Sequence, residues 1–382
     1  MIERSAKHYS VNPGEIYLSG GDPNFATPAH IRDAAIKAIL EGYTHYAPSQ
    51  GIPECQEAVA NYYSKYGVDY DPSQIHITSG GGLALYHAMA GFLEPGDEVL
   101  TFDPSYTANY SYPRALEATV VPVPLTEPGF HLNVEELKKR ISKKSKLLMM
   151  TNPCNPSGTV FTRDELKAVS DLIIDNDLLL VSDEFYSEYV YDGRKHVAIS
   201  SLDGMKDRTI VILGGTKIFA FTGWRMACII TPKDLYPKVR SKMVCRIGPA
   251  TFIQRAAAVG FNALTESYGA GVMKEWRDEF DKRRLFFCKR MDDIEGVSCH
   301  TFEGAFYAYP DVSSFGVPVE KIVQELGEKE HVRIANGERF GGVSIVGKES
   351  PAWGHIRPCL VQDLDDLEEA ANRIERYLKT LK

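Results

Sequence analysis

Apolar residues along the chain follow two alternating patterns. Continuous apolar runs of strand length occur at EVLTF (98–102) and TIVIL (209–213), and similar runs lie between them. Longer stretches carry apolar residues at every third or fourth position, as a helix with one buried face requires. This alternation predicts an α/β fold, and strands that are apolar at every position are typical of a parallel sheet with helices on both faces.

The stretch TPAHIRDAAIKAIL (27–40) is the first clear helix pattern. Its apolar residues, Ile31, Ala35 and Ala38 among them, fall on one helical face. We expect Thr27 to be the N-cap, since a threonine hydroxyl can accept a hydrogen bond from the first turn, and Pro28 to be the first helical residue.

The pattern changes near residue 271. A long, charge-rich amphipathic helix is predicted at 273–291, HTFEGAFYAYP (300–310) is typical of a strand, and an apolar stripe runs along a last helix at 363–382. We therefore predict a large domain at 30–270 and a smaller domain built from 1–29 and 271–382.

Composition and charge exclude several classes of function. The chain has 382 residues and a net charge of −8, which disfavours binding to nucleic acid or to an anionic membrane. Its seven cysteines are scattered without a C-x-x-C pair, so we expect reduced thiols and no metal site. The first ten residues lack an apolar signal region, and no apolar run reaches membrane-spanning length. We expect a cytoplasmic protein.

Polar residues with chemical potential follow several of the predicted strands. The turn Ser79–Gly82, Asn155, Asp183 and Lys217 each come shortly after an apolar run. In open α/β sheets, ligands bind at the carboxyl ends of the strands. We therefore expect these residues to converge on one site.

Each of these signals also has an ordinary structural explanation. The glycine turn fits an anion site at a helix N-terminus or a tight turn without a ligand, and its spacing matches neither G-x-G-x-x-G nor a P-loop. The Asn-Pro pairs around Cys154 fit a rigid functional loop, in which a peptide bond could be cis, or a surface turn. Asp183 could pair with a cation, or it could cap a helix. Lys217 could be a reactive amine, or it could extend to solvent.

Together the signals describe one chemistry. An aldehyde-reactive lysine, a phosphate-binding turn, the nearby Arg225 and a carboxylate for a pyridinium nitrogen are the groups that pyridoxal 5′-phosphate (PLP) requires.

The chain resembles the fold-type I PLP-dependent class I and II aminotransferases, the aspartate aminotransferase superfamily, over nearly its whole length. The motifs occur in the family's order: LSGGDPNFATP, THYAPSQGIPECQEAVANYY, PCNPSG, SDEFY, TKIFAFTGWR, EGAFYAYP and HIRP. The resemblance implies a mixed, mostly parallel sheet flanked by helices, with a smaller α+β domain.

The resemblance also implies catalytic roles for matching residues. Lys217 would bind PLP as a Schiff base and move the substrate α-proton. Asp183 would keep the pyridine nitrogen protonated. Asn155 and Tyr186 would hydrogen-bond the phenolic oxygen of the cofactor, and Tyr106 would stack on its ring.

Further residues match the family's binding positions. The phosphate would be held by Gly81, Gly82, Thr216 and Arg225, and by Tyr46 from the second subunit of a homodimer. Substrate would be bound by Gly21, Asn155 and Arg357, with Arg357 on its α-carboxylate. Pro358 follows this arginine where an apolar residue is more usual, so its geometry stays open.

The implied activity is transfer of an amino group from an L-amino acid to a 2-oxo acid by a ping-pong Schiff-base mechanism. A β-lyase, such as a C–S lyase, or another PLP enzyme of the same fold is the alternative, because fold does not fix the reaction. We do not expect a PLP-sensing transcription regulator, because such proteins carry a DNA-binding domain before this fold and the family's first motif here begins at Leu18. The amino donor, the acceptor and the pathway stay open.

Overall fold

The computed structural model describes residues 2–5, 14–342 and 350–381. Its main feature is a seven-stranded sheet in the order β2-β8-β7-β6-β5-β3-β4. Strand β8 runs antiparallel to β2 and β7, whereas the other neighbouring pairs are parallel. The strands are β2 (Ile75–Thr78), β3 (Glu98–Asp103), β4 (Thr119–Pro124), β5 (Ser145–Thr151), β6 (Leu179–Asp183), β7 (Thr209–Leu213) and β8 (Ala227–Ile230).

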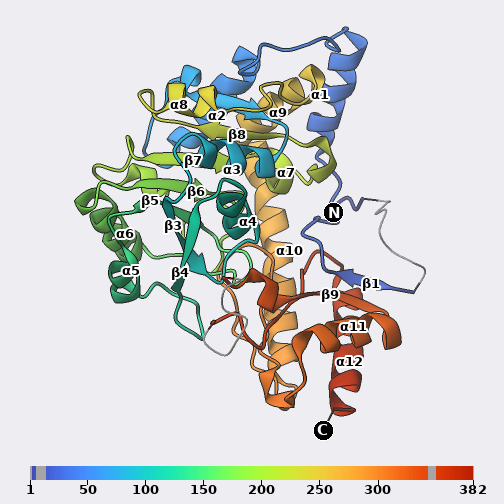
Figure 1. Ribbon diagram of the computed structural model, residues 1–382. Helices are drawn as coiled ribbons and strands as arrows, with labels where there is room; N and C mark the ends of the chain where they lie inside the picture. Colours follow the sequence, from blue (N-terminus) through green and yellow to red (C-terminus); the bar gives the residue numbers. More distant parts are fainter. Residues whose placement is uncertain (1, 6–13, 343–349, 382) are drawn as a thin grey trace.

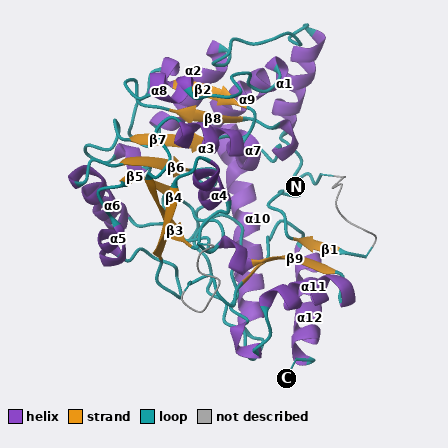
Figure 2. Cartoon of the chain, in the orientation of Figure 1, coloured by secondary structure: helices purple, strands orange, loops and turns teal. Residues whose placement is uncertain are grey.

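Helices cover both faces of this sheet, as the apolar strands predict (Figure 2). Along β5, Leu147 and Met149 belong to one buried cluster, and Leu148 and Met150 belong to the other. Side chains alternate across a strand, so the two clusters lie on opposite faces. One includes residues of α3 (Gly81–Ala90), and the other includes residues of α5 (Val134–Arg140) and α6 (Arg163–Asp175).

A second, three-stranded sheet joins the two ends of the chain (Figure 1). Strand β1 (Ile16–Leu18) pairs parallel with β9 (Val332–Asn336), and β10 (Ile356–Arg357) pairs antiparallel with β9. The N-terminal strand thus lies with elements of the C-terminal third. The division at residues 30 and 270 stays a prediction, and its segments include residues 6–13 and 343–349, which lie outside the described residues.

Long helices connect and flank the two sheets. Helix α10 (Ser267–Asp292) packs against α9 (Thr251–Leu264), which belongs with the large sheet, and against α12 (Leu364–Lys379), which belongs with the small one. No helix in the described ranges is long and apolar enough to cross a membrane. The other helices are α1 (Ala29–Leu40), α2 (Pro53–Ser64), α4 (Ala108–Ala115), α7 (Gly215–Ile218), α8 (Tyr236–Ser241) and α11 (Val319–Lys329), with short 3₁₀ turns η1 (Pro72–Gln74), η2 (Ile199–Ser201), η3 (Thr222–Trp224), η4 (Ser313–Phe315) and η5 (Gly337–Phe340).

Two local predictions are wrong. Helix α1 begins at Ala29 with Pro28 as its N-cap, and the Thr27 hydroxyl instead donates to the Ala220 carbonyl oxygen at 3.0 Å. The segment 300–310 forms no strand and makes only isolated bridges, among them Tyr307 with Cys359. In both places a partner distant in the sequence determines the local structure.

Candidate active site

A cavity of about 370 Å³ lies beside the ends of β5, β6 and β7 and the start of α3. Eleven of the twelve residues predicted for the site line this cavity. They are Gly21, Gly81, Gly82, Tyr106, Asn155, Asp183, Tyr186, Thr216, Lys217, Arg225 and Arg357. The predicted convergence at one edge of the sheet is therefore observed.

Lys217 lies in the one-turn helix α7, directly after β7. Its Nζ donates to the Gly21 carbonyl oxygen. Burial is the main cause that lowers the pKa of this amine, while a nearby carboxylate, Asp22, acts in the opposite direction. A Cβ at Gly215 would collide with the Phe221 ring, so the tight turn that carries the lysine requires glycine there. Burial therefore favours the neutral amine over the ammonium form.

Asp183 is the last residue of β6 and is 4% exposed. Burial raises the pKa of its carboxyl to about 7, although the Phe185 backbone N–H donates to it at 3.3 Å. In this environment, a cationic or proton-bearing partner would strongly stabilise the ionised carboxylate. Such a partner would lower the pKa again.

The start of α3 forms one end of the cavity. Gly80 has a φ of 98°, which favours glycine, and a Cβ there would lie 2.5 Å from Nη2 of Arg225. A Cβ at Gly82 would lie 2.7 Å from the Tyr112 hydroxyl. The first-turn N–H groups of a helix and a guanidinium attract anions, so this end fits a phosphate.

Asn155 lies in the loop after β5, which contains cis bonds at Asn152-Pro153 and Asn155-Pro156. The Oδ1 atom of Asn155 is buried without a hydrogen-bond partner. Tyr186 is also buried, and its hydroxyl lies 2.7 Å from that of Tyr307. An unpaired buried amide oxygen costs free energy unless a ligand or water donates a hydrogen bond to it.

Arg357 enters the cavity from β10. Its Nη2 donates to the Ser19 carbonyl oxygen at 2.8 Å, but Nε and Nη1 are buried without partners. A carboxylate can accept two parallel hydrogen bonds from such a guanidinium, one from the second hydrogen of Nη2 and one from the unpaired Nη1 or Nε. The carbonyl oxygen of Pro358 accepts from the Ala308 N–H at 3.0 Å, so the proline is compatible with an arginine that points into the cavity.

Tyr46 is the predicted residue that does not line the cavity. It lies in the turn after α1 and is 89% exposed. Sequence reasoning also missed residues that do line it. Tyr307 follows from the EGAFYAYP motif, whereas Phe340, in η5, has no motif that marks it.

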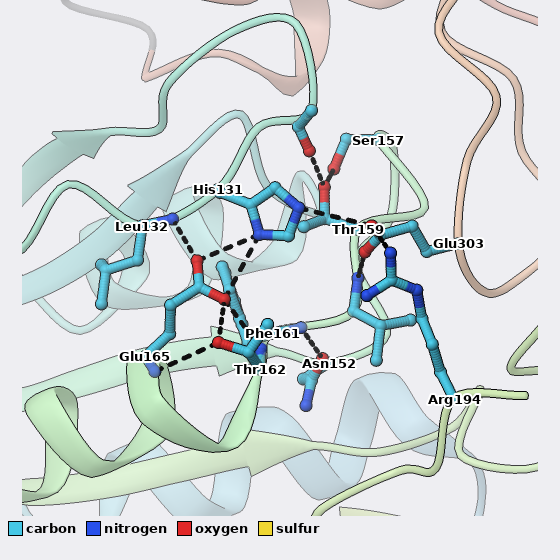
Figure 3. Close-up of polar contacts among 12 residues, drawn as sticks. His131, Leu132, Asn152, Ser157, Thr159, Phe161, Thr162, Glu165, Arg194 and Glu303 are labelled. Atoms are coloured by element: carbon cyan, nitrogen blue, oxygen red, sulfur yellow. Dashed lines mark hydrogen bonds and ion pairs between the residues drawn. The ribbon is translucent and has the colours of Figure 1, made fainter. Parts of the chain in front are cut away.

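A second group of charged side chains lies outside the cavity, and we call it the histidine cluster: His131, Glu165, Glu303 and Arg194 (Figure 3). His131 Nδ1 lies 3.0 Å from Glu165 Oε1, and Nε2 lies 3.4 Å from Glu303 Oε1. Arg194 Nη2 lies 2.6 Å from the same Glu303 oxygen, and the Val160 N–H donates to the other at 3.1 Å. The carboxylates here are paired.

The cavity residues fit PLP by their chemistry. A cavity amine with a lowered pKa, a buried carboxyl with a raised pKa and an anion-binding helix start correspond to its aldehyde, ring nitrogen and phosphate.

Comparisons with known proteins agree with this fit. Residues 13–374 match the family model described as aminotransferase class I and II. The chain is 34% identical to an aspartate aminotransferase of Pyrococcus abyssi, over 96% of this chain and 92% of that protein. It is 36% identical to aromatic-amino-acid aminotransferase 2 of Thermococcus litoralis, over 97% and 93%. The crystal structure of an aromatic aminotransferase from Pyrococcus horikoshii matches with a TM-score of 0.89 and 34% identity, over 97% of this chain and 96% of that one.

Proposed function

Because the chain belongs to the class I and II aminotransferase family, whose members use PLP, we propose that the cavity around Lys217 is its active site. The enzyme transfers an amino group between an amino acid and a 2-oxo acid. The observation that carries the proposal is the buried Lys217 amine, which shares one cavity with Asp183 and with the unpaired nitrogens of Arg357.

When bound, PLP supplies an aldehyde that reacts with amines and a protonated ring that withdraws electrons from the substrate α-carbon. Lys217 Nζ would act first as the nucleophile and then as the base that removes the α-proton and returns it. Its lowered pKa favours both roles, since a neutral amine is needed.

The carboxylate of Asp183 would hold the proton of the ring nitrogen, because it gains most from a proton-bearing partner. Asn155 and Tyr186 would donate to the phenolic oxygen, and the Tyr106 ring would stack on the pyridine. The backbone N–H groups of Gly81 and Gly82, with Thr216 and Arg225, would bind the phosphate.

Arg357 would orient the substrate by its α-carboxylate, next to Gly21 and within the same cavity as Lys217. Orientation of the substrate is itself a large part of catalysis, because it turns an encounter between two molecules into an intramolecular reaction. Arg357 also excludes substrates that lack a carboxylate, since its buried charge would then stay unpaired.

We further propose a homodimer in which Tyr46 completes the phosphate site of the partner. Apolar side chains are exposed on α1 and on the turn after it. Helix α9 packs against α1 and contributes another exposed apolar residue, Val259. The exposed residues on α1 and its turn are Ile36, Ile39, Leu40, Tyr43 and Tyr46, with Leu40 82% exposed. A contiguous apolar surface of this kind marks a protein interface. Light scattering should give twice the chain mass, and a monomeric mass would contradict the proposal.

The proposed location is the cytoplasm. All seven cysteines are free, and six of them are buried. Free thiols are typical of a reducing compartment. Fractionation of the source cells, followed by immunodetection of this chain, would test the assignment.

We propose an aromatic amino acid as the amino donor. Tyr307 and Phe340 lie close to Arg357, and Tyr106 lines the same cavity. Within the described ranges, the cations that line it are Lys217, Arg225 and Arg357, and the proposed roles use all three. No further cation among the described lining residues is left for a second substrate carboxylate.

A donor screen with a fixed 2-oxo acid acceptor tests both the reaction and the donor. Aromatic amino acids should exceed aspartate in kcat/KM by about tenfold or more, because an aspartate carboxylate would be buried without a partner. Preference for aspartate would contradict the donor proposal. Release of oxo acid and ammonia without any acceptor would contradict transfer itself and favour a lyase.

A further inference from the structure

Tyr307 lies between the residues proposed to bind cofactor and substrate. It is 2% exposed and lines the cavity. Its hydroxyl lies 2.7 Å from the Tyr186 hydroxyl, and its ring centroid lies 4.6 Å from Cζ of Arg357. One side chain thus contacts both the residue proposed for the phenolic oxygen and the residue proposed for the substrate carboxylate.

The backbone fixes this arrangement. Tyr307 forms an isolated antiparallel bridge with Cys359, and the Leu360 N–H donates to the Phe306 carbonyl oxygen at 2.9 Å. A Cβ at Gly21 would collide with the Tyr307 hydroxyl, so the segment whose carbonyl accepts from Lys217 also packs directly on this tyrosine. Tyr307 has little freedom to move away.

The pair of hydroxyls contains one useful asymmetry. Each tyrosine has a single hydrogen to donate, so only one of the two donates within the pair. Tyr186 lines the cavity, and the proposed function assigns its hydrogen to the phenolic oxygen of the cofactor. The hydrogen between the two hydroxyls, which lie 2.7 Å apart, must then come from Tyr307.

We propose that Tyr307 is a positioning residue that donates to Tyr186 and thereby leaves the Tyr186 hydrogen free for the phenolic oxygen of the cofactor, while its ring supports Arg357. The inference rests on the proposed function of the cavity. Tyr307 then makes two separable contributions: its hydroxyl acts on the cofactor through Tyr186, and its ring acts on the substrate through Arg357.

The hydroxyl is tested by Tyr307→Phe in the PLP-loaded enzyme. The readout is the pH midpoint of the absorbance change of the bound cofactor, which does not depend on turnover. Without the hydrogen bond from Tyr307, Tyr186 becomes a weaker donor and stabilises the negative charge of the phenolic oxygen less. The midpoint should therefore rise by about 0.4 to 1 unit, the equivalent of one hydrogen bond. KM should stay within about twofold, since the ring under Arg357 is kept.

The matched control is Tyr309→Phe. Tyr309 comes from the same segment and is equally buried, but its hydroxyl donates to the Gly337 carbonyl oxygen at 2.8 Å and does not line the cavity. The control should leave the midpoint unchanged. An unchanged midpoint in Tyr307→Phe, or an equal shift in both variants, would overturn the role of the hydroxyl.

The ring is tested by Tyr307→Leu, which should shift the midpoint in the same way and also raise KM for the amino acid by about 3- to 30-fold through loss of the cation–π contact. An unchanged KM would overturn the role of the ring. If this variant fails to fold, the Tyr307→Phe result alone decides the proposal. Absence of any titrating cofactor absorbance in the unsubstituted enzyme would contradict the proposed function instead, and with it this inference.

Discussion

The proposed active-site cavity and the histidine cluster both bring acidic and basic side chains together, yet burial dominates the pKa values in the cavity, whereas hydrogen bonds outweigh burial in the cluster. In the cluster, the hydrogen bonds that His131 donates to the two glutamates raise its pKa to about 9, and the pKa of Glu165 falls to about 2. In the cavity, burial lowers the pKa of Lys217 and raises that of Asp183 to about 7. The cluster favours charged forms and the cavity favours neutral ones.

The difference lies in the partners. Each charged group of the cluster has a partner within the chain (Figure 3). The cavity instead contains buried polar atoms without partners on Asn155 and Arg357. Each such atom costs about 1 to 3 kcal/mol, which a protein retains where a ligand supplies the missing partner. Between these two regions, the cavity differs from the cluster in having unpaired polar atoms that a ligand can complete.

The largest expected effect comes from Lys217→Ala, which removes both nucleophile and base. Amino transfer should fall by at least about 10³-fold. The matched control is Lys65→Ala, because Lys65 is also a lysine with a lowered pKa but is paired with Glu188 outside the cavity. Turnover should remain in the control, and comparable losses in the two variants would contradict the distinction.

Asp183→Asn should lower activity by about 10²-fold or more, because the ring nitrogen loses its anionic partner. It should also stabilise the cofactor-free protein at pH 8. The folded-state pKa of Asp183 is about 7, above the ordinary value of 3.8, so ionisation opposes folding and stability falls as the pH rises between these values. Urea unfolding at pH 5 and pH 8 measures this. Equal destabilisation at both pH values would indicate a structural carboxylate.

His131→Gln should differ from Asp183→Asn in both measurements. Turnover should be nearly unchanged, and the free energy of unfolding should fall by about 0.5 to 1.5 kcal/mol at pH 6. The folded-state pKa of about 9 exceeds the ordinary 6.5, so the contribution of the imidazolium is complete below pH 6.5 and is lost as the pH rises through 9. The deficit of the variant should therefore shrink between pH 6.5 and 9. A large loss of turnover in a folded variant would contradict the structural assignment.

The smallest expected effect is that of Arg194→Ala. Its side chain is 40% exposed, and solvent screens its ion pair with Glu303, so stability should change by about 1 kcal/mol or less. Thermal unfolding in low and high salt measures the difference, which should diminish with salt. A salt-independent loss above that size would show that this pair is not screened.

The sequence predicts the parts of the site that depend on local order. Asp183 and Lys217 end or follow apolar strands, and parallel strands bring their carboxyl ends to one edge whatever the rest of the chain does. The glycines at the start of α3 are similarly marked by their own turn.

Other features depend on contacts between distant segments and could not be predicted from local patterns. Thr27 caps no helix because its hydroxyl donates to Ala220, far away in the sequence. The segment 300–310 has a strand pattern, but its neighbours offer only isolated bridges. Phe340 reaches the cavity from a 3₁₀ turn without any motif, and the contacts of Tyr46 belong to the proposed partner subunit.

The most direct test of the central claim is borohydride reduction of the PLP-loaded protein, followed by proteolysis and mass spectrometry. The account predicts one stable cofactor label on Lys217, because its buried amine with a lowered pKa lies in the same cavity as Asp183 and the start of α3. The absorbance of the bound cofactor should disappear together with transfer activity. A label on a different lysine, or a colourless protein after incubation with PLP, would contradict the account.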